Sequence, residues 1–253
     1  MIDRPEEYEK MDLAEKELWW YKILHEQTLC VIREKHKTKA ITILDAACGT
    51  GGLIHYLQRN GFQSIRGFDL SPEAVKRSRQ KTKADIALLD LKEVLLHYPL
   101  QSFDVVVCHD ALYFVGDNDF PGVLNSLWSL LKPNGQLILN LPAGNLFKGM
   151  HDRTVGIQER WSYKRVEKML RLSEVSYKSI DHWNWPFLLS PLILMIRLLQ
   201  RLKLMIFSNT VVTSDVELPP LVLNYIFYKL TKWEGYLPFK RKFGSSLFIV
   251  IHR

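Results

Sequence analysis

The sequence predicts an α/β protein with a doubly wound, mostly parallel sheet and helices on both faces. Residues 41–52 (ITILDAACGTGG) have the pattern of a short apolar strand, a glycine-rich turn and the start of a helix. Residues 103–108 (FDVVVC) form a continuous apolar run, typical of a parallel strand buried on both faces. In such sheets ligands bind at the carboxyl ends of the strands, so we expect a nucleotide-type pocket beside the glycine turn.

The glycine turn is the feature around which the rest of the chain is organised. Gly49, Gly51 and Gly52 let the backbone turn sharply and approach a ligand that any Cβ would obstruct. The helix that follows directs its unpaired N–H groups to the same place. The third glycine of the dinucleotide fingerprint is missing, and so is the Lys-Ser/Thr pair of a P-loop. Instead an acidic residue, Asp45, precedes the turn.

Before the turn, residues 3–36 have apolar positions near a helical spacing and predict a helix. After it, residues 53–60 predict a crossover helix, and residues 64–69 a second strand that ends at Asp69. A carboxylate at this position can accept hydrogen bonds from both ribose hydroxyls of a nucleotide. Ser71 then caps the next helix, with Pro72 in its first turn.

Three further strands follow in the first two thirds of the chain. Residues 84–89 predict the third strand, with Asp90 directly after it, and residues 103–108 the fourth. His109 and Asp110 come at the end of the fourth strand, where ligands bind in such sheets. A helix restarts at Pro121 and ends at LKPNG, and the fifth strand covers residues 136–141.

The second half begins with a loop over residues 142–161, long enough to indicate a functional segment. A helix capped by Ser162 and a sixth strand at residues 175–183 follow, and residues 245–252 predict the last strand. The strongly apolar segment 186–207 and a helix at 218–233 form an insertion before that strand. Two interpretations stay open for residues 186–242: a helical lid over a hydrophobic substrate or a dimer partner, or an interfacial helix on a membrane.

Four motifs in order over residues 41–141 resemble those of the class I S-adenosylmethionine (SAM)-dependent methyltransferases. They are DAACGTG at the turn, the acids that end the second and third strands, and LKPNG before a strand. The resemblance implies a seven-stranded sheet of order 3-2-1-4-5-7-6 with an antiparallel seventh strand, and SAM as cofactor. The cofactor-binding residues it implies are Asp45, Ala46, Cys48, Gly49, Gly51, Asp69, Leu70, Asp90, Leu91 and His109.

Two further segments resemble a bacterial subgroup of type 11/12-like methyltransferases. WWYKILHE (residues 19–26) resembles an N-terminal helix that covers the SAM pocket, and the loop carries the subgroup's H-D pair, although a second histidine is absent from GIQERW at 156–161. The substrate-binding candidates are Trp20, Tyr21, His25, Tyr113, Asp152 and Trp161. Removing a proton from the acceptor needs a base. The candidates for this catalytic role are His109, His151 and His25, with Asp110 or Asp152 to orient them.

Composition limits the remaining classes. The 253 residues, 47% of them apolar, predict a single domain (1–253): a helical cover (1–36), a SAM-binding core (37–183), the insertion (184–243) and the last strand (244–253). Three cysteines without ligand-like spacing indicate a reducing, cytoplasmic setting with no bound metal. The net charge of +7 leaves an anionic membrane open, but nucleic acid is not the expected partner, because no basic run with interleaved aromatics occurs.

We therefore expect a methyltransferase for a bulky or apolar small molecule, such as a natural product, a sugar-linked compound or a lipid-like compound. Alternatives are an RNA or protein methyltransferase, a non-catalytic SAM-fold protein and a nicotinamide oxidoreductase. The first lacks support because HDALYF (residues 109–114) differs from the N/D-P-P-Y/F pattern of many amino-group methylators of nucleic acid. A non-catalytic SAM-fold protein would have a damaged glycine motif. A nicotinamide oxidoreductase would need the third glycine of the dinucleotide fingerprint, which is missing here.

Overall fold

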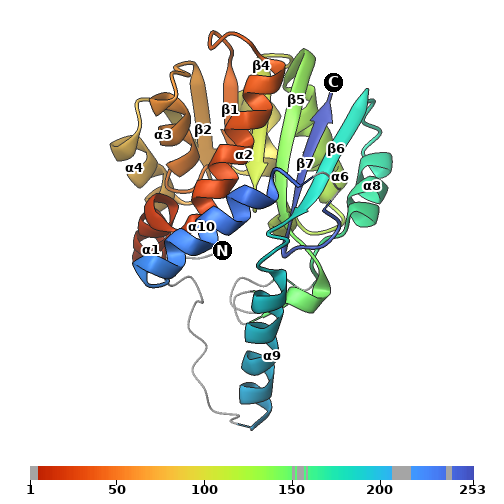
Figure 1. Cartoon of the computed structure of the whole chain (residues 1–253). Coiled ribbons are helices and arrows are strands. Elements are labelled where there is room, and N and C mark those ends of the chain that lie inside the picture. The colour runs from red at the N-terminus through yellow and green to blue at the C-terminus, as the bar shows by residue number, and fades with distance from the viewer. Residues whose placement is uncertain (1–4, 150–151, 153–156, 158, 207–217, 238–240) are drawn as a thin grey trace.

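A computed structural model describes residues 5–149, 152, 157, 159–206, 218–237 and 241–253. Its centre is a seven-stranded sheet of order β3-β2-β1-β4-β5-β7-β6 (Figure 1). The strand bounds are β1 Ile43–Ala46, β2 Ile65–Asp69, β3 Asp85–Leu88, β4 Phe103–His109, β5 Leu131–Pro142, β6 Ser179–Trp185 and β7 Ser246–His252. Strand β7 runs antiparallel to both of its neighbours, and the pairs among β1 to β5 are parallel. The predicted strand order is thus confirmed.

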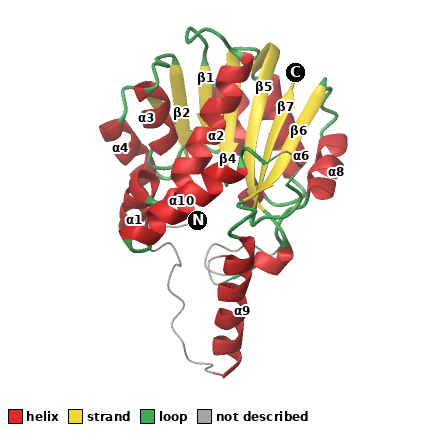
Figure 2. Ribbon diagram, viewed as in Figure 1, coloured by secondary structure: helices red, strands yellow, loops and turns green. Residues whose placement is uncertain are grey.

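Helices cover both faces of the sheet (Figure 2). The helix bounds are α1 Pro5–Glu17, α2 Trp19–Lys35, α3 Gly52–Arg59, α4 Pro72–Lys81, α5 Val94–His97, α6 Phe120–Ser129, α8 Tyr163–Leu172, α9 Ser190–Ile206 and α10 Leu221–Glu234. Single 3-10 turns lie at Leu91–Glu93, Leu112–Val115 and Asn145–Phe147. Helices α2, α3 and α4 cover one face of the sheet, and α5, α6 and α8 contribute to the core on the other.

Two hydrophobic cores lie on the two sides of the sheet. Along β4, Val106 belongs to one core, and Val105 and Val107 belong to the other. All three side chains are completely buried. The apolar run FDVVVC therefore forms a central strand, because both of its faces are covered by helices.

Two serine residues that the sequence predicts as helix caps do lie at helix starts. The Ser71 hydroxyl accepts a hydrogen bond from the Ala74 N–H at 3.3 Å, and the Ser162 hydroxyl accepts one from the Arg165 N–H at the same distance. Each satisfies one of the unpaired donors of a helix N-terminus. The single helix expected over residues 3–36 is instead two helices, because Leu18 adopts an extended conformation between them.

The sixth strand also differs from its expected range. It covers Ser179–Trp185 rather than 175–183, because pairing with β7 sets its register from Ser179 opposite His252 to Trp185 opposite Ser246. Val175, before the strand, is buried in the core instead.

The two helices of the insertion lie at one end of the molecule. Helix α10 packs across α2, whereas α9 projects away from the body (Figure 1). Among the described residues, no helix is both long and apolar enough to cross a membrane.

Candidate functional site

The turn after β1 has the backbone geometry that its glycines allow. Gly49 and Gly51 have φ angles of +55° and +82°, in the left-handed region that favours glycine. Gly51 is the N-cap of α3, so the free N–H groups of that helix face the turn. A Cβ on Gly51 would lie 2.4 Å from the Ser78 hydroxyl oxygen. The turn thus has no room for a side chain at this position.

Asp69 joins the turn to the end of β2. Its Oδ2 accepts a hydrogen bond from the Gly49 N–H and its Oδ1 one from the Ser71 N–H, each at 2.9 Å. Burial raises the pKa of the Asp69 carboxyl, and the backbone hydrogen bonds oppose this rise. Asp69 therefore lies directly at the glycine turn, as a ribose-binding acid would, and its ribose contact stays a prediction.

Carboxyl groups gather around the turn. Asp45 is buried, and burial, with the nearby charges of Glu15 and Asp69, raises its pKa to about 8. Glu15 comes from α1, and its carboxylate accepts hydrogen bonds from the Thr50 hydroxyl at 2.6 Å and from the Lys81 amine at 3.2 Å. Because carboxylates repel one another in a low-dielectric site, this cluster favours a cationic ligand group such as an ammonium.

Of the other predicted cofactor residues, Ala46 ends β1 and Cys48 lies in the turn, while Leu70 follows β2 and Asp90 and Leu91 follow β3. Ala46 and Cys48 are buried, and Leu91 is nearly so. Leu70, directly after Asp69, is 43% exposed, an apolar side chain available to a flat ring. Asp90 caps the following 3-10 turn by accepting a hydrogen bond from the Lys92 N–H at 2.9 Å. That contact suffices to explain an acid at this position, so its adenine contact stays a prediction.

A second polar group of residues lies where β4 and β5 end. The Asp110 Oδ2 accepts a hydrogen bond from the Asn140 amide at 2.8 Å, and the Asn140 Oδ1 accepts one from the Trp185 indole at 3.0 Å. Burial raises the pKa of Asp110 to about 7, while the Asn140 hydrogen bond and the charge of Arg160 oppose the rise. Asp110 also has a φ angle of +49°, a strained conformation of the kind found at functional sites.

His109 and His25 lie close enough to influence each other's protonation. Burial lowers the pKa of both imidazoles to about 3, so both are neutral near pH 7. The Thr28 hydroxyl donates to the Leu24 carbonyl at 2.8 Å and lies 3.3 Å from the His109 Nε2. The Thr28 hydroxyl has one proton, and it donates that proton to the Leu24 carbonyl, so towards His109 it can only accept. The His109 Nε2 therefore carries the proton of the neutral imidazole, and its Nδ1 is unprotonated. His109 is thus neutral and a weak base.

The aromatic segment of α2 lies between these two polar groups. Trp20 stacks on Trp185 with ring centroids 5.1 Å apart. Tyr21 is partly buried, and its pKa is raised by burial and by the charges of both Glu15 and Asp110. Tyr21 is therefore near the glycine turn and near the end of β4 at once. The cover over the SAM pocket that the sequence predicts for this helix stays a prediction.

Other predicted residues have structural roles. Trp161 is 2% exposed and packs on Phe120 in the core, which differs from the acceptor contact expected of it. Asp152 is completely buried and accepts two hydrogen bonds from the Arg160 guanidinium, at 2.7 and 3.0 Å. Asp152 is thus held by an ion pair, and its substrate contact stays a prediction. His151 lies outside the described residues.

Tyr113 is the remaining substrate candidate. Its pKa is raised by burial and by the charges of Asp110 and Asp152. It therefore lies near the second polar group, as expected of a residue that contacts the acceptor. That contact stays a prediction.

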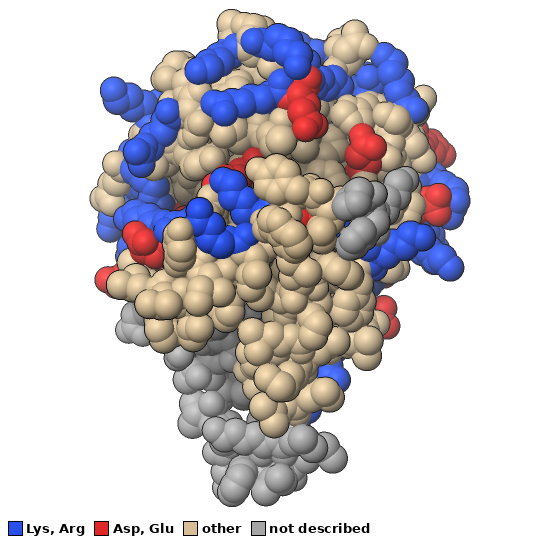
Figure 3. Space-filling model, in the orientation of Figure 1, with Lys and Arg blue, Asp and Glu red and all other residues tan. Residues whose placement is uncertain are grey.

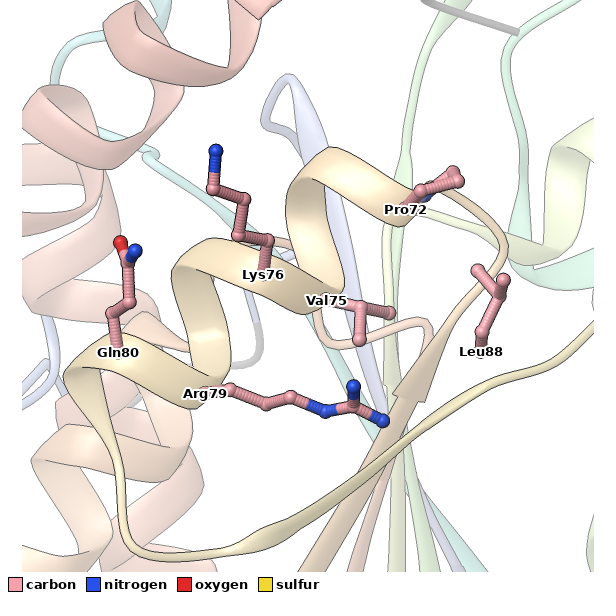
Figure 4. A pocket seen from close by; sticks show the side chains of 6 residues that line it. All are labelled: Pro72, Val75, Lys76, Arg79, Gln80 and Leu88. Atoms are coloured by element: carbon pink, nitrogen blue, oxygen red, sulfur yellow. The ribbon is translucent and has the colours of Figure 1, made fainter.

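A surface hollow of about 390 Å³ lies elsewhere, along α4 (Figure 4). Val75 and Leu88 give it an apolar floor, and Lys76 and Arg79 lie at its sides (Figure 4). None of the predicted site residues lines it. We assign it no role in the chemistry.

The fold and the glycine turn agree with the resemblance to the class I SAM-dependent methyltransferases. Residues 43–135, from β1 into β5, match the family model described as a methyltransferase domain. YqeM of Bacillus subtilis, whose name assigns it to the methyltransferases, is 34% identical over 105 residues. That match covers 39% of this chain and 41% of YqeM, so the chain spans less than half the length of this relative.

Two solved structures have the same fold. A chain in the complex of the Haloferax volcanii Trm112 methyltransferase activator with a methyltransferase gives a TM-score of 0.58 at 20% identity, covering 95% of this chain and 91% of that one. Haemonchus contortus phosphoethanolamine N-methyltransferase 2, solved with SAM, gives a TM-score of 0.54 at 17% identity. The alignment covers 90% of this chain and 52% of that one. The chain thus carries a methyltransferase domain of the class whose cofactor is SAM.

Proposed function

We propose that the protein transfers the methyl group of SAM to an oxygen, nitrogen or carbon atom of a small-molecule acceptor. One observation carries the proposal: Tyr21 lies near the acids of the glycine turn and near Asp110 at the end of β4. A cofactor group at the turn and an acceptor at Asp110 would meet beneath the same helix. Such positioning is the main contribution a protein makes to this reaction.

Binding of SAM is assigned to residues of the glycine turn. SAM supplies the methyl group and a sulfonium leaving group. Asp69 would accept hydrogen bonds from the ribose hydroxyls, and Leu70 would contact the adenine ring. Asp45 would hold the ammonium group, because its burial is unfavourable without a cation, whereas Glu15 is already paired with Lys81. The Gly52 N–H at the start of α3 already donates to Glu15, so we assign the SAM carboxylate to the other N–H groups of the turn.

Asp110 is our preferred base for an acceptor O–H or ammonium N–H. Its pKa of about 7 suits proton transfer near neutral pH, whereas His109, with a pKa of about 3, is a much weaker base. His109 would then orient the acceptor through its unprotonated Nδ1. Tyr21, Tyr113 and Trp20 would form the apolar walls of the acceptor site.

The acceptor we propose is bulky or apolar, such as a natural product or a lipid-like compound. Tyr21 and Tyr113 are partly buried aromatic side chains, and such side chains favour an apolar group over a charged polymer. An RNA or protein acceptor remains the alternative, and acceptor screening separates the two.

Calorimetric titration tests the cofactor first. We expect SAM and S-adenosylhomocysteine to bind with micromolar affinity, and NADH to give no signal. Transfer of labelled methyl from SAM to acceptor libraries, with the Asp110→Asn variant as a control, then tests catalysis. A folded protein that bound no SAM would instead support a non-catalytic SAM-fold protein, and the enzyme proposal would fail.

A further inference from the structure

Helix α10 has buried polar residues on the side that faces the body and a large exposed apolar face. Asn224 and Thr231 are buried against the body, and the Asn224 amide joins α10 to α2 by a 2.7 Å hydrogen bond to the Glu17 carbonyl and a 2.9 Å bond from the Trp19 N–H. The opposite face is apolar and exposed: Leu221 84%, Val222 71%, Tyr225 60%, Ile226 42% and Trp233 57%. A surface helix in water normally has the reverse pattern.

Helix α9 continues this apolar surface. It projects from the body (Figure 1), and Met195, Ile196, Leu198 and Leu199 are 43% to 59% exposed. On the face shown, the lower part of the molecule around α9 has few charged side chains, whereas lysine and arginine gather over the upper and middle parts (Figure 3). Contiguous exposed apolar surface on this scale marks a binding surface.

The position of α9 relative to α10 is fixed. Glu234, at the end of α10, is completely buried and accepts hydrogen bonds from the N–H groups of Phe187 and Leu188, at 2.7 and 2.9 Å. Near the other end of α9, Arg201 donates to the carbonyls of Leu146 and Lys148, at 3.0 and 2.9 Å. The surface is therefore built into the fold, because both helices are bonded to the domain.

The charges of this surface have one sign. In the described parts of the insertion, 186–206 and 218–237, Glu234 is the one acidic residue, and it is buried. Arg197, Arg201 and Lys229 supply the cations, whereas Lys232 is paired with Glu26 of α2 at 3.0 Å. Lys229 lies 5.3 Å from the ring of the exposed Tyr225, beside the apolar face. Exposed aromatic and cationic side chains bordering an apolar face are typical of helices that lie in a membrane interface.

We propose that α9 and α10 form a docking surface for an anionic phospholipid membrane, with the apolar side chains among the acyl chains and the cations at the head groups. A second copy of the chain fits less well, because a two-fold contact would bring the same cations together, and the one acid in the described parts of the insertion is buried. A small-molecule acceptor is too small to cover two helices. The proposal is independent of methyl transfer, since it concerns this surface alone.

Vesicle sedimentation with the full-length protein tests the proposal. We expect the protein to bind vesicles that contain phosphatidylglycerol, to bind phosphatidylcholine vesicles much less, and to dissociate as salt is raised. Leu221→Glu should weaken binding by about tenfold, because a charge replaces a side chain that enters the membrane. Lys229→Gln should weaken it by about fivefold at low salt.

The matched control is Leu96→Glu. Leu96 is 87% exposed on α5, against 84% for Leu221, and α5 belongs to the opposite side of the sheet. This variant should bind vesicles like the unmodified protein. Unfolding temperature and SAM titration of each variant show that the fold is retained. Equal binding to both vesicle types, or no binding to either, would overturn the proposal, and so would a dimer in light scattering that Leu221→Glu dissociates.

Discussion

The Asn140 side-chain amide lies 2.8 Å from the Asp110 carboxylate and is itself held by the Trp185 indole. This contact joins the ends of β4 and β5, where ligands bind in doubly wound sheets. A hydrogen bond to a carboxylate favours its charged form, whereas burial favours the neutral form. Asn140 thus moderates the protonation of the group that we propose as the base.

Asp110→Asn tests the base directly. In the unmodified enzyme, methyl transfer should rise with pH and level off above about 7, because Asp110 accepts a proton only once it is ionised. The variant should lose about 10²- to 10⁴-fold in kcat and show no rise through this range. The measurement is kcat against pH with an acceptor found by screening. A rate that is flat above pH 5 in the unmodified enzyme would instead support His109, whose pKa is about 3.

Asn140→Ala should raise the pKa of Asp110 further, because the variant removes a donor that stabilises the carboxylate. Carbon-13 NMR of the side-chain carboxyl groups measures this shift without any acceptor. The Asp110 signal, assigned by its loss in Asp110→Asn, should titrate at higher pH in the Asn140 variant. An unchanged or lower titration midpoint would remove Asn140 from the proposed mechanism.

The sequence could predict the sheet because its signals are local. The central strands β4 and β5 contain short apolar runs, and Ser71 and Ser162 mark helix starts through contacts only three residues long. Asp45 and Asp69 could be placed because strand ends of a parallel sheet meet at one edge. The surroundings of these two acids were harder to predict from the sequence, because the pKa of Asp45 depends on Glu15, which is 30 residues away in the chain.

Contacts between distant segments account for what sequence reasoning missed. Asn140 is a polar residue within the apolar strand QLILNL, a signal that could have been noticed. Glu15 gave no such signal, because an acid on a predicted surface helix is ordinary. Trp161 was expected at the acceptor but packs on Phe120 in the core. The sequence alone does not distinguish an aromatic loop residue that packs in the core from one that contacts a substrate.

Asp69→Ala should weaken SAM binding by about tenfold to a hundredfold, because charge-assisted hydrogen bonds contribute roughly 1.5–3 kcal/mol. Calorimetric titration measures the change. Asp85→Ala, an exposed acid at the start of the neighbouring strand β3, is the control and should bind SAM normally. Normal binding by a folded Asp69 variant would rule out the ribose contact.

Gly51→Ala should reduce SAM binding strongly, and Gly51→Val should abolish it. At a φ angle of +82° a Cβ costs about 1–2 kcal/mol, and here it would also lie 2.4 Å from the Ser78 hydroxyl. Gly122→Ala is the matched control, because a Cβ there meets nothing within 4 Å. SAM titration and thermal unfolding of the three variants provide the comparison. If Gly51→Ala behaved like Gly122→Ala, the turn would not need its glycine.

Lys81→Met should release α1 from the glycine turn. The Lys81 ammonium lies between Asp12 and Glu15, and its side chain is 11% exposed while that of Glu15 is 5% exposed. Removing one partner of a buried pair leaves the other charge uncompensated, at a cost on the order of 3–5 kcal/mol. Burial already raises the pKa of Glu15, and losing Lys81 raises it further, so the variant's Glu15 is protonated over a wider pH range.

The sign of the pH dependence follows from that shift. Protonated Glu15 tolerates burial and ionised Glu15 does not, so α1 of the variant should open more as pH rises. Hydrogen exchange of residues 8–17 at two pH values measures the opening, corrected for the intrinsic pH dependence of exchange. Lys76→Met is the control on the same helix, because Lys76 is 67% exposed and only 3.9 Å from Glu73 in a surface pair. Exchange in α1 that was the same in both variants would mean that the Lys81 contacts do not hold this helix closed.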